Sequence, residues 1–281
     1  MTFVENIFDQ LKQSTTEPVL QEIHGEKIHS VTGSELLALT QQARHFLLAR
    51  GLKKGDRCAL LAPNSIRWAA LDLALMAEGI VVVPLYARQA PAELVAMMQD
   101  STPSRIICLD AVIAAEIKKL WPQAPQISLL EGVYAGEPSA PTPPMHHQDS
   151  DVISIIYTSG TSGEPKGVVL TAGNVNHIVA ATNSRLDKLM GPRSQPDRIF
   201  HYAPFCFAAS WILLLSALSR HSVLALSTDL AKLAHELKLA APEFRQRCKS
   251  AAASPQQFSR APNKHSSAAT INNPNSAIFS G

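Results

Sequence analysis

Short apolar runs that suit buried β-strands alternate with helical patterns along the first part of the chain. We expect strands at 57–62, 80–84 and 105–109, where most residues are apolar, as in strands covered on both faces. Asn64 can cap a helix that runs to Gly79, and Pro91 suits the first turn of the next helix. This order predicts an α/β fold with mainly parallel sheets flanked by helices, whose ligands bind at the carboxyl ends of the strands.

Helices and strands are also expected on either side of this repeat. Thr32 and Glu35 have the spacing of a capping box, so a helix should begin at Thr32, and Gly51 suits its end. The other expected elements are a hairpin at 23–28, a helix, turn and strand over 211–226 with Trp211 in the core, and an amphipathic helix at 230–239.

A loop rich in glycine and hydroxyl groups follows a buried-strand pattern in Ile153–Leu170, ISIIYTSGTSGEPKGVVL. Its glycines let a ligand approach the main chain closely, and backbone N–H groups in such turns point together at an anion. The hydroxyls add donors, and Lys166 adds a positive charge. We therefore predict a polyphosphate site formed by Thr158, Ser159, Gly160, Thr161, Ser162, Gly163, Lys166 and Gly167.

This loop differs from the common P-loop, in which the lysine is followed by Ser or Thr and then by a helix. Here Lys166 is followed by Gly167 and by the strand-favouring residues 168–170, so the order is strand, loop, strand. A kinase-like or GTPase-like site is therefore disfavoured. The alternative that stays open is a polar hairpin without a ligand, because Gly/Ser/Thr loops are common.

The segment Tyr157–Gly167, YTSGTSGEPKG, closely resembles the signature loop of the adenylate-forming enzymes. This superfamily contains acyl-CoA synthetases, peptide-synthetase adenylation domains and beetle luciferases. The resemblance extends over roughly residues 20 to 243, where Leu71–Pro84 and Asp197–Leu226 are similar to further family segments. It implies an AMP-binding, fatty-acid-CoA-ligase-like protein, of which this chain would be an incomplete N-terminal domain.

The resemblance also implies a reaction. The loop would grip the β- and γ-phosphates of ATP, with Lys166 as the catalytic residue, while a carboxylate attacks the α-phosphorus to give acyl-AMP and pyrophosphate. A thiol, usually that of coenzyme A, would then accept the acyl group. Mg²⁺ would bridge the phosphates with few protein ligands, so we expect no metal site made by the protein alone.

The segment Asp197–Ser210, DRIFHYAPFCFAAS, provides candidates for the acyl pocket. Aligned through its proline, the family usually has a histidine or an aromatic residue where this chain has Phe207, and we take Phe207 and Ser210 as candidates. The aromatic residues favour an apolar or fatty acid as substrate, although clustered aromatics are also ordinary core. His201 is expected to be structural, because an ionised carboxylate needs no base.

Composition agrees with a cytoplasmic enzyme. The net charge is only +2, and the four cysteines are widely spaced, which disfavours disulfides and zinc sites and favours a reducing compartment. The start of the chain does not resemble a secretory signal, and its richest apolar stretches are interrupted by charges, so no membrane span is expected. The sequence carries no signal for the oligomeric state.

Two segments have the composition of irregular chain. Residues 136–150, with four prolines, suggest an exposed connector in which His146 and His147 are solvated and bind no metal. Residues 244–281 contain five basic residues, no acidic one and no sustained apolar period. We expect 1–243 to be a partial AMP-binding domain and 244–281 to be a basic low-complexity tail, either disordered or translated from a shifted reading frame.

Three functions are compatible with these features. The family's adenine, ribose and lid motifs are missing, so the first is a truncated acid-thiol ligase that is inactive on its own. The second is a non-enzymatic regulator that binds a nucleotide or a partner through the retained part. The third is a nucleic-acid-binding arm at 244–281, which we disfavour because its five charges are spread out.

Overall fold

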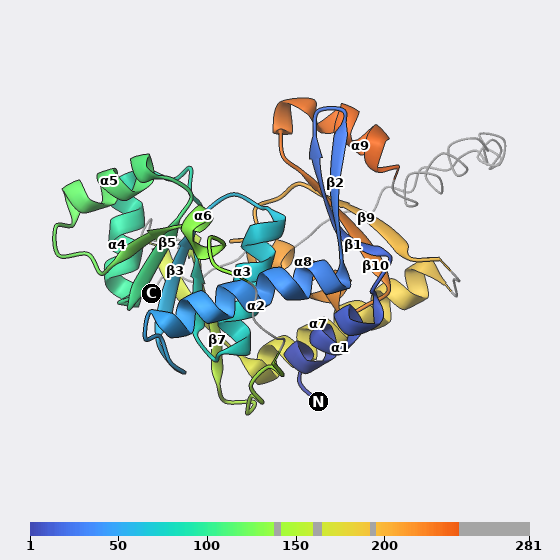
Figure 1. The fold of residues 1–281 in the computed structure, drawn as a ribbon, viewed down its shortest axis with the longest axis horizontal. Helices are drawn as coiled ribbons and strands as arrows, with labels where there is room; N and C mark the ends of the chain where they lie inside the picture. The colour runs from blue at the N-terminus through green and yellow to red at the C-terminus, as the bar shows by residue number, and fades with distance from the viewer. Residues whose placement is uncertain (138–141, 160–164, 192–194, 242–281) are drawn as a thin grey trace, which may run out of the picture. The chain divides into compact units, whose positions relative to one another are not determined.

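The computed structural model describes residues 1–137, 142–159, 165–191 and 195–241 (Figure 1). These residues belong to the unit Met1–Phe244. The predicted phosphate-loop residues Gly160, Thr161, Ser162 and Gly163 lie outside the described residues, as does the predicted tail, 244–281.

The described residues form helices and strands that alternate along the chain. The strands are β1 (Pro18–His24), β2 (Lys27–Thr32), β3 (Arg57–Leu61), β4 (Val81–Pro84), β5 (Arg105–Cys108), β6 (Ile127–Leu129), β7 (Val152–Ser159), β8 (Pro165–Thr171), β9 (Asp197–His201) and β10 (Ser222–Ser227). The α-helices are α1 (Phe3–Gln13), α2 (Gly33–Ala49), α3 (Ile66–Ala77), α4 (Pro91–Ser101), α5 (Ala111–Leu120), α6 (Leu130–Val133), α7 (Ala172–Met190), α8 (Ala208–Leu218) and α9 (Leu233–Ala240), with a short 3₁₀ helix at Leu230–Lys232.

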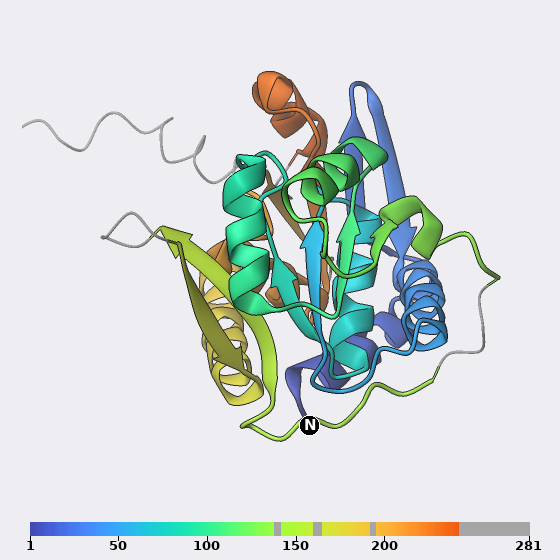
Figure 2. The ribbon, with the colours of Figure 1, turned by 90° about the vertical axis from the view of Figure 1, so that its left-hand side faces the viewer.

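The larger sheet has six strands in the order β6-β5-β3-β4-β7-β8. All neighbouring pairs are parallel except β7 and β8, which form an antiparallel hairpin at one edge. Helices α4 and α5 cover one face of this sheet, where Val95 and Ile117 pack against strand residues such as Ile106 (Figure 2). The predicted α/β fold with mainly parallel sheets is confirmed.

The smaller sheet joins segments from both ends of the described chain. Its order is β2-β1-β10-β9, in which β1 and β2 form the predicted hairpin and β1 pairs in parallel with β10. Leu20 of β1 is the register partner of Leu224 of β10. Helix α9 covers the outer face of this sheet, with Ala240 packed beside Ile23 and Ala225.

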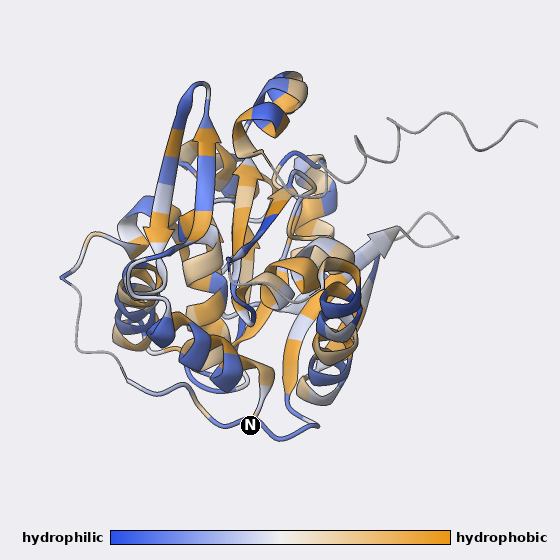
Figure 3. Cartoon of the chain, turned by 90° about the vertical axis from the view of Figure 1, so that its right-hand side faces the viewer, coloured by the Kyte–Doolittle hydropathy of each residue, from blue (hydrophilic) through white to orange (hydrophobic). Residues whose placement is uncertain are grey.

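Helix α3 packs against β4 of the larger sheet and β1 of the smaller one. All of its residues except Arg67 are buried, which its nearly unbroken apolar sequence explains. Figure 3 shows the same contrast for the whole fold, with apolar residues concentrated on inner strands and polar residues on the outer helices. Trp68 of α3 and Trp211 of α8 belong to the same core cluster and are almost wholly inaccessible to solvent. The predicted core position of Trp211 is therefore confirmed.

The start of α3 corrects one sequence expectation. Ser65 is its N-cap, and its hydroxyl accepts a hydrogen bond from the Trp68 N–H at 3.0 Å. The prediction that Asn64 caps this helix is wrong, because the Asn64 side chain bonds the backbone of residues 203–205 instead. The predicted capping box of Thr32 and Glu35 is present at the start of α2.

Residues 142–151, which we call the strap, lie largely within the predicted exposed connector, and the structure adds backbone contacts that hold them in place. The Arg44 guanidinium of α2 donates hydrogen bonds to the carbonyls of Thr142, at 2.6 Å, and Pro143, at 3.0 Å. The Met145 N–H donates to the Ala77 carbonyl at the end of α3. Many strap side chains are exposed. The strap backbone is nevertheless held against α2 and α3 by these bonds, since a proline-rich segment makes few backbone hydrogen bonds within itself.

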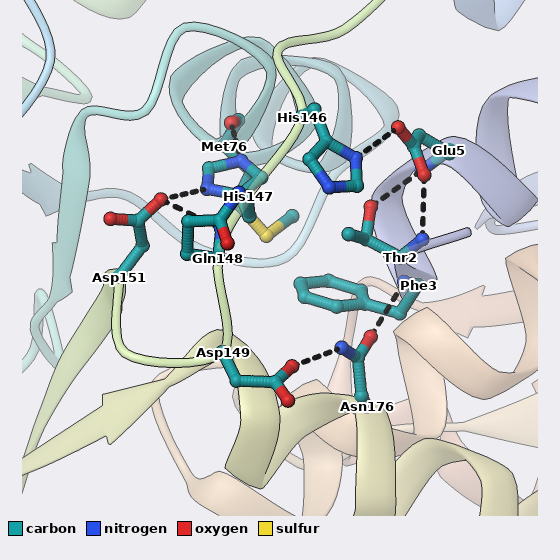
Figure 4. Close-up of polar contacts among 10 residues, drawn as sticks. All are labelled: Thr2, Phe3, Glu5, Met76, His146, His147, Gln148, Asp149, Asp151 and Asn176. Atoms are coloured by element: carbon teal, nitrogen blue, oxygen red, sulfur yellow. Dashed lines mark hydrogen bonds and ion pairs between the residues drawn. The ribbon is translucent and has the colours of Figure 1, made fainter.

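The two histidines of the strap differ (Figure 4). His146 is exposed and lies 2.8 Å from the Glu5 carboxylate of α1. His147 is 2% exposed, and its Nε2 bonds the Met76 carbonyl at 2.8 Å. The prediction that His147 is solvated is wrong, because the carbonyls at the end of α3 need donors and the imidazole supplies one.

Asp72 is a buried carboxyl group on α3. Its Oδ2 accepts a hydrogen bond from the Trp211 indole N–H at 2.8 Å, and its Oδ1 has no hydrogen-bond partner among the described residues. Burial disfavours the charged form and raises the pKa of Asp72 to about 7, although the Trp211 bond partly opposes this. Asp72 therefore links folding to pH.

We expect Asp72→Asn to remove a pH-dependent loss of stability. The pKa of Asp72 is raised on folding. Its contribution to the free energy of unfolding is therefore fully present below about pH 4 and is lost as the pH rises through about 7. Since each pKa unit is worth about 1.4 kcal/mol, the loss amounts to a few kcal/mol. Urea unfolding between pH 4 and 8 should show that the free energy of unfolding of Asp72→Asn, relative to that of the wild type, rises with pH by that amount. Asp9→Asn, at an exposed ion pair with Lys12, should show no such gain.

Candidate functional site

A cleft of about 440 Å³ lies where the carboxyl ends of strands from both sheets meet. Each parallel strand except β6 and β7 contributes residues at or just beyond its end, because a common strand direction brings these ends to one edge. The lining residues are Glu22 and His24 from β1, Ala62–Ser65 after β3, Leu85–Arg88 after β4, Leu109 and Ile113 after β5, Tyr202 and Pro204–Cys206 after β9, and Ser227, Thr228 and Leu230 at and after the end of β10.

Two side chains connect the sheets at this cleft. The Asn64 amide donates to the Ala203 carbonyl and accepts from the Phe205 N–H, both at 2.8 Å. Glu22 of β1 accepts a hydrogen bond from the Ile66 N–H in the first turn of α3. The segments that follow β3 and β9 are therefore fixed to each other, although they belong to different sheets.

The Phe205 side chain anchors one wall of the cleft. Its ring lies 5.1 Å from the Trp68 ring and stacks on His201 at 5.4 Å with an angle of 4° between the planes. Burial lowers the pKa of His201, which favours the neutral imidazole. These contacts agree with the predicted structural role of His201.

The acyl-pocket candidates lie beside the cleft and do not line it. Phe207 is the N-cap residue of α8, is about half exposed, and has its ring 6.0 Å from that of Tyr86. Ser210 is buried in the first turns of α8. The structure brings Tyr202, Phe205 and Cys206 to the cleft instead. A role for Phe207 or Ser210 in acid binding stays a prediction.

The described ends of the predicted phosphate loop lie at the tip of the β7–β8 hairpin. Thr158 and Lys166 are register partners on the two strands, and both are exposed. Val82 of β4 pairs with Ser154 of β7. Pro84, the last residue of β4, is therefore level with residue 156 of β7, and β7 continues beyond the end of β4 toward the loop. The hairpin therefore presents a hydroxyl and an ammonium group side by side.

This pair of donors suits an anion. A hydroxyl and an ammonium group offer hydrogen bonds to phosphate oxygens, and the ammonium group has no lone pair with which to bind a cation. Among the residues that the structure describes, no group of three or more His, Cys, Asp or Glu side chains could hold a metal ion. Thr158 and Lys166 are described residues that fit the phosphates of a triphosphate–magnesium complex.

Gly167 has a packing reason for lacking a side chain. It is the register partner of Tyr157, and a Cβ added to it would lie 2.9 Å from Ile155 Cγ2 and 3.2 Å from the Tyr157 ring. The Tyr157 hydroxyl in turn bonds the Met97 carbonyl of α4. Gly167 thus lets an aromatic side chain lie across the hairpin, while its predicted phosphate contact stays a prediction.

The cleft residues that sequence reasoning missed include Glu22, His24 and Asn64. The Glu22 carboxylate and the His24 imidazole lie 2.9 Å apart on β1, more than 170 residues away in sequence from the β9 segment across the cleft. No local pattern marks them. Asn64 carried a usable signal, because a polar residue just after a buried strand lies at the edge where ligands bind.

The comparisons agree with this architecture. The AMP-binding enzyme family matches residues 8–270, and the chain belongs to this family of adenylate-forming proteins. The match continues past residue 243, and the predicted boundary there stays a prediction. Long-chain-fatty-acid–CoA ligase FadD13 of Mycobacterium tuberculosis H37Rv is 31% identical over 211 residues, which is 71% of this chain and 42% of FadD13.

Solved structures show the same fold. O-succinylbenzoate coenzyme A synthetase (MenE) from Bacillus subtilis, in complex with ATP and magnesium, matches with a TM-score of 0.69 and 17% identity over 83% of this chain and 60% of that one. A fatty acyl CoA synthetase of Mycobacterium tuberculosis matches with a TM-score of 0.71 and 23% identity, over 84% of this chain and 47% of that one. The chain thus spans less than half the length of FadD13. No described helix is long and apolar enough to cross a membrane.

We expect Gly167→Ala to destabilise the β7–β8 hairpin. The added methyl group would meet Ile155 and the Tyr157 ring, and overpacking of this kind costs about 1–3 kcal/mol. Urea unfolding should show this loss. Gly132→Ala is the matched control, because a Cβ there meets no atom within 4 Å. Equal stability of the two variants would contradict the packing role of Gly167.

Proposed function

We propose that this chain provides the carboxylate-activating part of an acid–thiol ligase. The observation that carries the proposal is the placement of Thr158 and Lys166 as exposed partners at the tip of a hairpin, within the segment that resembles the family's signature loop. Membership of the AMP-binding enzyme family supports it.

The proposed reaction begins with ATP held by its phosphates. Lys166 and the hydroxyl groups of the loop neutralise the charge that develops on the leaving pyrophosphate, which is the main demand of phosphoryl chemistry. The ionised carboxylate of the acid attacks the α-phosphorus, the bond to the pyrophosphate oxygen breaks, and acyl-AMP forms. A thiol, proposed to be that of coenzyme A, then displaces AMP to give a thioester. Mg²⁺ supplies further charge neutralisation on the phosphates.

The proposed substrate is an acid with an apolar chain. Leu85, Leu109 and Phe205 line the cleft, and apolar walls with a few polar groups suit a ligand with a polar head and a hydrocarbon tail. The name of FadD13, a long-chain-fatty-acid–CoA ligase, supports the same class. The cleft and the β7–β8 hairpin belong to the same unit of the fold.

The alternative function is a regulator that binds a nucleotide or a partner without catalysis. The observation that favours it is the exposed pair Thr158 and Lys166, which can hold phosphates without any chemical step.

We expect Lys166 to be needed for acid activation. The hairpin 152–171 would be grafted into FadD13 in place of the matching residues, and acid-dependent ATP–pyrophosphate exchange would be measured with and without Lys166→Ala. Loss of a charged partner at a reacting site should slow the exchange by about 10²–10³-fold. Urea unfolding of the grafted enzyme with and without Lys166→Ala controls for the stability effect of removing the lysine. Unchanged exchange in the grafted Lys166→Ala enzyme would refute the assignment.

We expect the isolated chain to bind ATP weakly. Charge-assisted hydrogen bonds contribute about 1.5–3 kcal/mol each. A handful of them from the predicted phosphate loop to ATP would therefore contribute on the order of 10 kcal/mol, before the cost of association is subtracted. Association costs about 4–15 kcal/mol, and micromolar affinity needs about 8 kcal/mol net. Calorimetry with ATP and magnesium should therefore detect no micromolar binding. Micromolar affinity without turnover would favour the regulator.

A further inference from the structure

The segment Tyr202–Cys206, which we call the cleft loop, leads from β9 of the smaller sheet to α8. Tyr202, Phe205 and Cys206 line the cleft, so the path of this backbone sets the shape of one wall. The cleft loop contains no helix or strand of its own. Its backbone groups therefore need other partners.

Asn64 supplies two of these partners. Its carboxamide donates from Nδ2 to the Ala203 carbonyl and accepts at Oδ1 from the Phe205 N–H, both at 2.8 Å. One planar group with a donor on one side and an acceptor on the other suits two backbone groups that are two residues apart. A serine offers a single shorter hydroxyl, and an ionised aspartate lacks the donor.

The position of Phe205 depends on these bonds. Its side chain is 1% exposed and lies in contact distance of Trp68 on α3 and His201 on β9. Asn64 itself lies between β3 and α3, which belong to the larger sheet's β-α-β repeat. The Asn64 side chain thus attaches the cleft loop, which follows β9 of the smaller sheet, to the carboxyl edge of the larger sheet.

We propose that Asn64 is the positioning residue of the acid-binding cleft. It acts by holding the cleft loop so that Phe205 and its neighbours form the wall against which the apolar part of the acid lies. The proposal rests on the proposed function, because it takes an apolar carboxylic acid as the occupant of the cleft. Glu22 strengthens the same junction through the Ile66 N–H.

The test measures acid affinity and stability in the 281-residue chain. The probe is cis-parinarate, a fluorescent fatty acid, titrated into the wild type, Asn64→Ser and Asn64→Asp at pH 8. We expect both variants to bind the probe about tenfold more weakly, the effect of one or two lost hydrogen bonds. Urea unfolding reports whether each variant is folded under the conditions of the titration.

Asn176→Ser is the matched control. Asn176 also links two segments, because it accepts from the Phe3 N–H at 2.7 Å and donates to Asp149 at 3.4 Å, but it lies outside the cleft (Figure 4). We expect it to lose stability and to keep the probe affinity of the wild type. An equal loss of affinity in Asn176→Ser and Asn64→Ser would show a general effect of destabilisation and overturn the proposal.

The pH dependence of Asn64→Asp separates positioning from simple destabilisation. Protonation of the introduced carboxyl, whose ordinary pKa is about 3.9, restores a donor for the Ala203 carbonyl, so its affinity relative to the wild type should begin to recover as the pH falls from 8 to 4. Asn64→Ser should show no recovery. Because Glu22, His24 and His201 are present in every variant, the ratio to the wild type isolates the introduced group.

Two negative results have different meanings. Wild-type affinity in Asn64→Ser, with the wild type binding the probe, would overturn the positioning role and leave the proposed acid site intact. Failure of the wild type to bind cis-parinarate would overturn the acid site, and the positioning role with it.

Discussion

The burial of α3 between the two sheets is the constraint on which the site depends. This helix has one exposed residue, Arg67, and packs against β4 on one side and β1 on the other. Burying a large apolar side chain contributes about 1.5–3 kcal/mol, so α3 with its leucines, Trp68 and Met76 holds the two sheets strongly. Because α3 begins directly after β3, its placement also brings the carboxyl ends of both sheets to one cleft.

Hydrogen bonds between polar groups then fix the relative positions of elements that apolar packing alone would leave variable. Asn64 and Glu22 join the sheets at the carboxyl edge, and the strap joins α1, α2, α3 and α7 near the opposite end of α3. Apolar contacts are non-directional and tolerate small shifts, whereas these hydrogen bonds specify position. The Asp72–Trp211 pair adds one directional contact inside the core.

Local signals predicted much of the fold. The strands β3, β4 and β5, the capping box at Thr32 and the strand–loop–strand order around Lys166 follow from residues that lie next to one another in sequence. Long-range partners were not predictable in this way. His147 looked like a solvated residue in a proline-rich connector, and only the carbonyl of Met76 explains its burial. Asn64 fitted a helix cap equally well until its partners at 203–205 were known.

The pairing of β1 with β10 affects how the protein is made. Leu20 and Leu224 are partners, so β1 must wait for 204 further residues before its parallel neighbour exists. At a synthesis rate of about 5–20 residues per second, this interval is about 10–40 s. During it, the β1–β2 hairpin exposes the unpaired edge of β1, which chaperones can bind and with which other chains can pair. Codons or chaperones that act on this interval would therefore affect the yield of folded protein more than the stability of the finished fold.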